Sequence, residues 1–100
     1  MESIVLPPAL KVIREGEFTG CKKLKSVSFG ENSVLEEIKP RAFYGYRLES
    51  FVAPPSLKKI GVAAFGACSA LKSFELNEDI QELGWLCFWG TKIKDLKIPL

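Results

Sequence analysis

Cysteine offers this sequence its widest choice of chemistry, because a thiolate can attack a substrate, bind a metal or form a disulfide. The three cysteines are Cys21, Cys68 and Cys87. They cannot all pair within one chain, and no two of them have the CxxC spacing of a metal-binding motif. Histidine is absent, which removes the usual general base of a nucleophilic cysteine and the commonest metal ligand. With no glycine-rich phosphate loop either, we expect a protein that is not an enzyme and holds no metal or cofactor.

The composition suits one small globular domain: 47% of the 100 residues are hydrophobic and 26% are charged. A net charge of +2, from 14 basic and 12 acidic residues, gives no reason to expect a nucleic-acid partner. No run of apolar residues reaches the roughly 18 needed for a membrane span, so none is expected. The first residues, MESIVLPPAL, show no signal peptide.

An internal repeat sets the positions of all these side chains. Each unit has an apolar pair, then a phenylalanine, then an apolar residue that opens an alternating segment. The phenylalanines recur at intervals of 25, 22 and 23 residues, at Phe18, Phe43, Phe65 and Phe88. The four units read LKVIREGEFTGCKKLKSVSF, LEEIKPRAFYGYRLESFVA, LKKIGVAAFGACSALKSFEL and IQELGWLCFWGTKIKDLKI.

Each unit ends in a six-residue alternation that predicts a short strand with one buried face. The inward residues are expected at Val27 and Phe29, Phe51 and Ala53, Phe74 and Leu76, and Leu96 and Ile98. SIVL, at residues 3–6, predicts a further strand with Ile4 and Leu6 inside. A unit of 22 to 25 residues cannot close a core alone, so the units should stack into a solenoid with a parallel sheet along one side.

The segment IGVAAFGACSAL in the third unit resembles the repeat of the BspA-like, or Treponema pallidum type, leucine-rich repeats. VLPPAL and VAPPSL resemble the proline segment that ends strands in that family. Three departures are Glu17 in place of alanine, and Tyr46 and Thr91 in place of cysteine. The resemblance implies a leucine-rich-repeat solenoid with its short parallel sheet on the concave side and irregular segments or short strands on the convex side. It also implies a surface-associated or secreted protein implicated in adhesion.

The resulting organisation is one solenoid domain over residues 1–100. Its repeats are approximately 1–23, 24–47, 48–70 and 71–92, with a partial repeat at 93–100. No polar capping segment is apparent at either end of the sequence. We expect a fragment of a longer array; self-association through uncapped ends is the alternative.

Charges of alternating sign fall into columns when the units are stacked. The columns are Lys11, Glu36 and Lys58; Glu37, Lys59 and Glu82; and Lys25, Glu49 and Lys72. Strands about 4.8 Å apart bring such residues into pairing distance. Each exposed pair contributes under about 1 kcal/mol, so we interpret the columns as support for the register of the stack.

Two surfaces are candidates for binding. The first is the open face of the predicted sheet, where small and polar residues alternate with the buried ones: Ser26, Ser28, Ser50, Val52, Ser73, Glu75, Asp95 and Lys97. This face either binds a protein or peptide or is exposed to solvent without a binding role. The second is aromatic: Trp85 and Trp89 lie outside the repeat frame, with Tyr44 in the Trp89 column. They form either an exposed interface or local packing over the last coil.

The predicted function is therefore a non-catalytic protein-interaction module, with a structural spacer or self-assembling segment as the alternative. In the stack, Cys21 and Cys68 are two units apart, about 10 Å on strand spacing and beyond the roughly 7 Å limit for a disulfide. Cys87 occupies the column of Ala42 and Ala64. We expect free, buried thiols.

Overall fold

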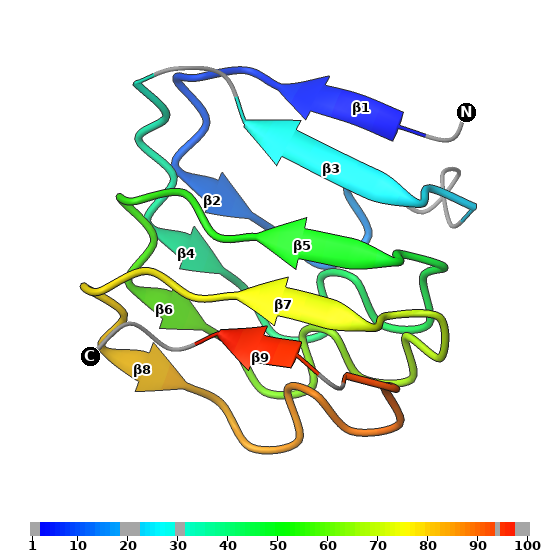
Figure 1. The fold of residues 1–100 in the computed structure, drawn as a ribbon. Helices are drawn as coiled ribbons and strands as arrows, with labels where there is room; N and C mark the ends of the chain where they lie inside the picture. Colours follow the sequence, from blue (N-terminus) through cyan, green and yellow to red (C-terminus); the bar gives the residue numbers. More distant parts are fainter. Residues whose placement is uncertain (1–2, 19–22, 30–31, 94, 98–100) are drawn as a thin grey trace.

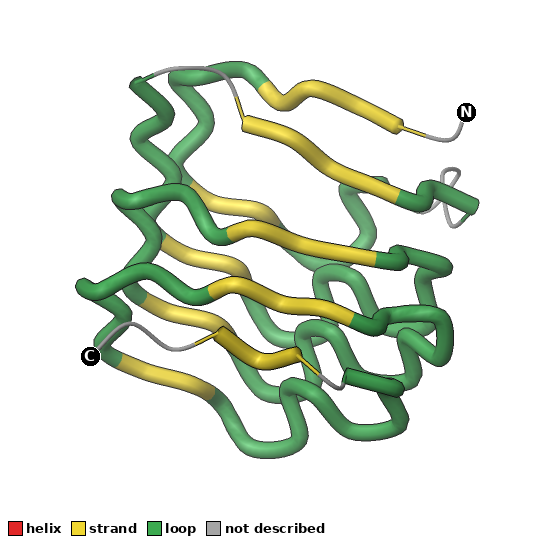
Figure 2. Tube along the Cα trace, viewed as in Figure 1, coloured by secondary structure: helices red, strands yellow, loops and turns green. Residues whose placement is uncertain are grey.

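The chain winds into a solenoid of stacked coils, as the computed structural model in Figure 1 shows. The structure describes residues 3–18, 23–29, 32–93 and 95–97. Two rows of short parallel strands lie on opposite sides of the coils and are joined by turns, and no helix occurs in these residues. The predicted leucine-rich-repeat solenoid is confirmed. Most of the chain is in turns rather than in strands (Figure 2).

The odd-numbered strands follow one another along one side of the stack, which we call the front row. The row consists of β1 (Ser3–Leu6), β3 (Ser26–Phe29), β5 (Ser50–Val52), β7 (Ser73–Glu75) and β9 (Asp95–Lys97). β1 pairs with β3, and β7 lies between β5 and β9, all in parallel. The amide of Glu49 donates to the carbonyl of Lys25 at 2.8 Å and joins the two groups just ahead of β3 and β5.

The even-numbered strands form one parallel sheet behind the front row, which we call the rear sheet (Figure 1). Its members are two residues long: β2 (Val12–Ile13), β4 (Glu37–Ile38), β6 (Lys59–Ile60) and β8 (Glu82–Leu83). β2, β4 and β6 each place an isoleucine inward, and Ile13, Ile38 and Ile60 are fully buried, whereas Leu83 of β8 is 42% exposed. The short strands predicted for this side therefore pair continuously along the stack.

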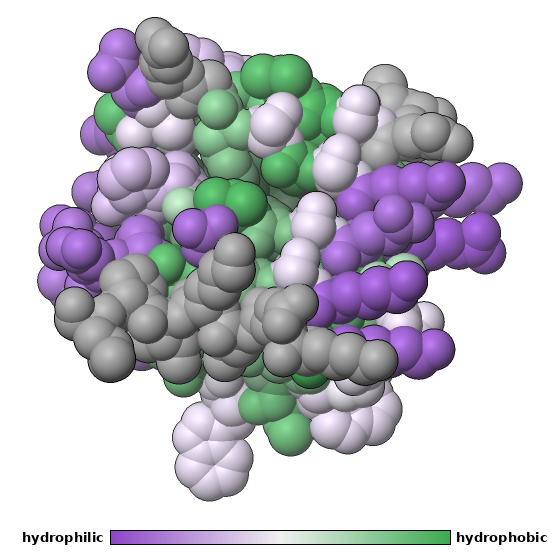
Figure 3. Space-filling model, viewed as in Figure 1, coloured by the Kyte–Doolittle hydropathy of each residue, from purple (hydrophilic) through white to green (hydrophobic). Residues whose placement is uncertain are grey.

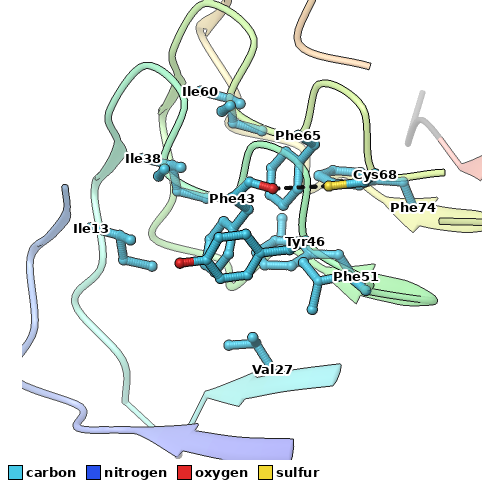
Figure 4. Packing of buried hydrophobic residues seen from close by; sticks show 14 of the residues in the cluster. Ile13, Val27, Ile38, Phe43, Tyr46, Phe51, Ile60, Phe65, Cys68 and Phe74 are labelled. Atoms are coloured by element: carbon cyan, nitrogen blue, oxygen red, sulfur yellow. Dashed lines mark hydrogen bonds between the residues drawn. The ribbon is translucent and has the colours of Figure 1, made fainter. Parts of the chain in front are cut away.

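Phenylalanines fill the space between the two rows (Figure 4). The frame residues stack one above another: Phe43 lies 6.0 Å from Phe18 and 5.3 Å from Phe65 between ring centroids, with nearly parallel planes. Phe51 and Phe74 enter from the front row, and both meet Phe65 edge-on. The predicted inward positions of the described strands are buried or partly buried. The side chains of Leu96 and Ile98 lie outside the described residues.

Each coil turns back through two positions at which the backbone is left-handed. The first position holds Gly16, Arg41, Ala63 and Leu86, and the second holds Gly45, Ala67 and Gly90, all at φ between 55° and 85°. A side chain in this conformation costs roughly 1 to 2 kcal/mol, whereas glycine adopts it freely. The path of the coil therefore imposes the conformation even where the residue type opposes it.

Exchanging residues at the second position should change stability in opposite directions. Gly45→Ala is expected to lower the free energy of unfolding by about 1 kcal/mol through the backbone alone, since an added Cβ would meet nothing within 4 Å. Ala67→Gly, at φ 58°, should leave stability unchanged or raise it by up to about 1 kcal/mol. Urea unfolding of both variants checks this, and a loss of stability in Ala67→Gly would contradict it.

Candidate functional site

The first candidate surface is the outward side of the front row, which we call the front face. Its first column pairs Ser3 with Ser26, and Ser50 with Ser73 and then Asp95. Its second column pairs Val5 with Ser28, and Val52 with Glu75 and then Lys97. Val27, Phe51 and Phe74, which alternate with these positions along the strands, are buried. The residues of the two columns therefore lie on the side of the strands that faces away from the core. The predicted columns are therefore in register within the β1–β3 pair and within β5, β7 and β9. The side chains of Asp95 and Lys97 lie outside the described residues.

Small side chains leave the front face flat and its apolar members accessible. Val5 is 69% exposed and Val52 is 57% exposed. Ser28 lies beside them, its hydroxyl at the limit of hydrogen-bonding distance, 3.5 Å, from the carbonyl oxygen of Ile4. In Figure 3 this surface is a band of pale and green atoms between hydrophilic groups on either side. A partner could thus reach both apolar side chains and polar hydroxyls on one surface.

A hollow of about 320 Å³ opens where β5 and β7 end. Val52, Pro55 and Leu76 give it an apolar lining, and the acidic residues Glu75, Glu78 and Asp79 complete it. Since Val52 and Glu75 also belong to the front face, the hollow extends that surface. Its negative charge favours a basic side chain as occupant.

Asn77 holds the turn beside this hollow, a role that the repeat frame did not indicate. Its Nδ2 donates to the carbonyls of Pro54 and Leu57 in the preceding coil, at 2.6 and 2.9 Å. Its Oδ1 accepts from the amide of Asp79 at 2.8 Å. The side-chain amide thus connects two coils and fixes the acidic rim. An asparagine directly after Leu76, the last residue of the alternating segment LKSFEL, was the available signal in the sequence.

The charge columns stack as predicted. Glu37 is paired in register with Lys59, and Lys59 with Glu82. Main-chain hydrogen bonds stack the other two columns, from Glu36 to Lys11, Lys58 to Glu36, Glu49 to Lys25 and Lys72 to Glu49. A shallow hollow on the rear sheet is lined by two acidic and two basic residues, Glu36, Glu37, Lys58 and Lys59. The acidic and basic charges that line this hollow are therefore equal in number.

The second candidate surface is aromatic and exposed. Trp85 is 84% exposed and Trp89 is 57% exposed, so more than half of each side chain is accessible to solvent. Trp89 follows Gly66 in its column, and the Tyr44 ring lies over Gly66, where an added Cβ would be 3.0 Å from the ring. Trp85 is adjacent to Val62, which is 46% exposed. These residues form an apolar strip down the side of the coils.

The described cysteines are not reactive groups. Cys68 and Cys87 are free and buried, as predicted, while Cys21 lies outside the described residues. The Cys68 thiol donates to the carbonyl of Phe43 at 3.0 Å (Figure 4). Burial raises the pKa of Cys68 from 9.0 to about 11, although hydrogen bonds from the backbone of Tyr46 and Gly45 oppose the rise. Burial also raises the pKa of Cys87. Such thiols are neutral at physiological pH and suit packing rather than nucleophilic attack.

The raised pKa of Cys68 should make stability fall in alkaline solution. The folded protein keeps this proton up to about pH 11, whereas the unfolded chain releases it near pH 9.0. The stabilisation is therefore complete below pH 9 and is lost as the pH rises toward 11, by about 2 to 3 kcal/mol. Urea unfolding at pH 8 and pH 10.5 measures the loss. Cys68→Ala, less stable at pH 8, should lose less than the wild type between the two pH values; equal losses would contradict the assignment.

The geometry defines the class of protein: a parallel β-solenoid with a phenylalanine at the same place in each coil, stacked through the core. The sequence pattern described as "BspA type Leucine rich repeat region" matches residues 1–100, in six copies. The chain therefore belongs to the BspA-type leucine-rich repeat family. Solenoids of this kind are typically non-catalytic. In the described part of the chain, no cluster of three or more histidine, cysteine or acidic residues is arranged to bind a metal.

One similar solved structure is the crystal structure of the pneumococcal vaccine antigen PcpA. It shares 26% sequence identity with this chain, at a TM-score of 0.69. The match covers 95% of this chain but 29% of the PcpA chain, so this sequence spans under a third of that protein. A search of curated proteins gave no match. Within the described residues, no helix has the length and apolar character to cross a membrane.

Proposed function

We propose that the chain is a non-catalytic protein-interaction module that binds a protein or peptide partner on the front face. The exposure of Val5 on β1 and Val52 on β5, on the outward side of strands whose other side faces the core, carries this proposal. Serines at Ser26, Ser50 and Ser73 keep the neighbouring backbone accessible. An extended or flat partner surface could contact several coils at once, which is how solenoids gain binding area from repetition.

The acidic hollow adds a preference for the partner's chemistry. Glu75, Glu78 and Asp79 surround an apolar floor, an arrangement that suits the aliphatic stem and charged head of lysine or arginine. The partner segment that lies along β5 and β7 would therefore carry a basic residue at the end of those strands. Glu75→Lys should weaken binding more than a neutral change at the same position does.

A location on the cell surface, or secretion from the cell, agrees with the family and with the similarity to a vaccine antigen. In that setting the module would contribute to adhesion.

Cross-linking mass spectrometry and affinity measurement with candidate surface partners test the proposal. Ser50→Arg together with Ser73→Arg should reduce affinity at least tenfold, or about 1.4 kcal/mol, because two long cations then cover the first column. Ser69→Arg, on an exposed turn outside the front face, is the matched control and should bind as the wild type does. Unchanged binding by the double variant would contradict the proposal.

A further inference from the structure

Basic side chains gather along the side of the stack where the front strands begin. Four successive strands of the front row, β3, β5, β7 and β9, are each preceded by at least one exposed cation. We call this row the basic flank, and its described members are Lys23, Lys25, Arg47, Lys72 and Lys92. Hydrophilic groups project from the same side of the pale band in Figure 3. The row runs along the stack, across the strands rather than parallel to them.

Main-chain hydrogen bonds between coils set the spacing of this row. The amide of Glu49 donates to the carbonyl of Lys25 at 2.8 Å, and the amide of Lys72 donates to the carbonyl of Glu49 at 3.0 Å. The amide of Lys92 donates to the carbonyl of Leu71 at 2.9 Å. Since neighbouring strands lie about 4.8 Å apart, the backbone of the basic flank spans roughly 14 Å from β3 to β9.

The repeat frame directs these side chains into solvent, because each lies next to an apolar residue that points into the core. Lys23 and Lys25 flank Leu24, which is fully buried, and both lysines are exposed. Arg47 is exposed in the same way and precedes Leu48, which is also fully buried. The stacking that buries one frame leucine in each coil therefore also lines up the charges beside it.

Positive charge exceeds negative charge on this flank. Among its five described cations, Glu49 is the one acidic residue in their columns within the part of the chain that the structure describes. The other ends of the strands have the opposite charge, with Glu75, Glu78 and Asp79 around the acidic hollow. A negatively charged chain is therefore attracted along the basic flank and repelled from the far ends of the strands.

Hydroxyl groups border the cations. Ser26 follows Lys25 and Ser73 follows Lys72, and both serines belong to the first column of the front face. That column continues at Asp95, whose side chain lies outside the described residues. Serine, lysine and arginine all donate hydrogen bonds, and those from a cation to an oxygen anion are the strongest. Parallel rows of such donors suit a ligand whose anionic groups recur along a line.

The surroundings of the basic flank favour a polysaccharide over other polyanions. None of its described members has an exposed aromatic neighbour in the chain, whereas proteins that bind single-stranded nucleic acids stack the bases on aromatic side chains. The row is also narrow and polar, whereas a surface that lies on an anionic membrane combines its cations with a face of apolar side chains.

We propose that the basic flank binds a linear sulfated polysaccharide, which lies along the stack across β3, β5, β7 and β9. Sulfate esters are negatively charged at neutral pH and accept hydrogen bonds from lysine, arginine and serine. Each exposed contact is weak, but a chain that contacts several coils at once adds them together. The site borders the front face, and the proposal does not depend on the proposed function.

Isothermal titration calorimetry with a heparin hexasaccharide tests the proposal. The wild type should bind this probe, should not bind the same hexasaccharide after its sulfates are removed, and should lose affinity as NaCl is added, because counterions are released on binding. Single-stranded DNA and phosphatidylserine vesicles should bind at least about tenfold more weakly at the same salt concentration. No binding of the sulfated probe, or equal binding of any of the other three, would overturn the proposal.

Two charge changes on the flank and one matched control locate the site. Arg47→Glu should lower the affinity for the sulfated hexasaccharide about fivefold or more, since it removes one attraction and adds one repulsion. Arg41→Glu makes the same change at an exposed position of the same coil outside the basic flank, and should leave the affinity within about twofold. Equal losses in the two variants would mean that net charge alone attracts the probe, which would overturn the site.

Glu49→Lys should raise the affinity for the sulfated hexasaccharide severalfold. The coil accepts this side chain, because lysine holds the equivalent position at Lys25 and Lys72 in the neighbouring coils. An unchanged circular dichroism spectrum is expected for this variant and for Arg47→Glu, since both replaced residues are exposed. A folded Glu49→Lys chain that binds the probe no better than the wild type would contradict the proposed path of the ligand.

The double variant Ser50→Arg with Ser73→Arg separates this site from the front face. It adds two cations beside the basic flank, so it should bind the sulfated hexasaccharide more tightly while it weakens binding of a partner on the front face. Weaker partner binding without a gain for the hexasaccharide would contradict the polysaccharide site alone. A gain for the hexasaccharide with unchanged partner binding would contradict the proposed function alone.

Discussion

Replacing Phe65 with alanine is expected to lower the free energy of unfolding by about 3 to 5 kcal/mol. The ring is fully buried and touches four other phenylalanines, at centroid distances of 4.8 Å to Phe51, 5.0 Å to Phe74, 5.3 Å to Phe43 and 6.4 Å to Phe88. The coils on both sides hold the cavity open, because their main chains are hydrogen-bonded to the coil that carries Phe65. Domains of this size have a total stability of roughly 5 to 15 kcal/mol, so the loss should remove a large share of the free energy of unfolding.

Phe88→Ala provides the comparison, since Phe88 holds the same place in the frame of the last coil but is only partly buried. Phe88→Ala should lower the free energy of unfolding by clearly less than Phe65→Ala, because fewer neighbours surround the cavity. Urea unfolding followed by circular dichroism gives both values. Equal losses would mean that the centre of the aromatic stack contributes no more than its end.

Gly61→Ala is expected to destabilise the fold by at least about 3 kcal/mol, at the upper end of overpacking costs. An added Cβ would overlap Pro40 N of the preceding coil and lie 2.8 Å from the carbonyl carbon of Lys39. Both are main-chain atoms and cannot rotate away as a side chain can. The coils would have to separate at the point where the amide of Gly61 donates to Ile38 at 2.8 Å.

The Gly45→Ala variant separates this steric effect from a general effect of losing glycine. Its added Cβ meets no neighbour, so it measures the backbone cost alone. Thermal unfolding of the two variants should place Gly61→Ala well below Gly45→Ala in melting temperature. The reverse order would contradict the close approach of the coils at Gly61.

The features that recur in every unit of the sequence were predicted correctly. A phenylalanine in each unit and the alternation of each strand determine which residues are buried, since apolar side chains must share one interior. The same alignment placed the front-face and charge columns in the observed register. The left-handed positions were not predicted, because Arg41, Ala63 and Leu86 share no side-chain property and only the coil's path imposes their backbone. The exposure of Trp85 and Trp89 needed the three-dimensional stack, since tryptophan is compatible with either a core or an interface.

Glu17 shows why an exception to a repeat can be informative. Where the other units carry alanine or cysteine, Oε1 of Glu17 accepts a hydrogen bond from the amide of Arg14 at 3.1 Å. The equivalent amides of Lys39 and Gly61 donate instead to Ile13 and Ile38 of the preceding coil. One replaced residue inside the repeat thus changes the hydrogen bonding of the coil without any change in the length of the unit.

In a solenoid each coil is stabilised by its neighbours, so loosening one coil weakens the coils beside it. The coil that carries Phe65 is hydrogen-bonded through its main chain to a coil on each side. Its amide protons should therefore be among the slowest of the described residues to exchange with solvent.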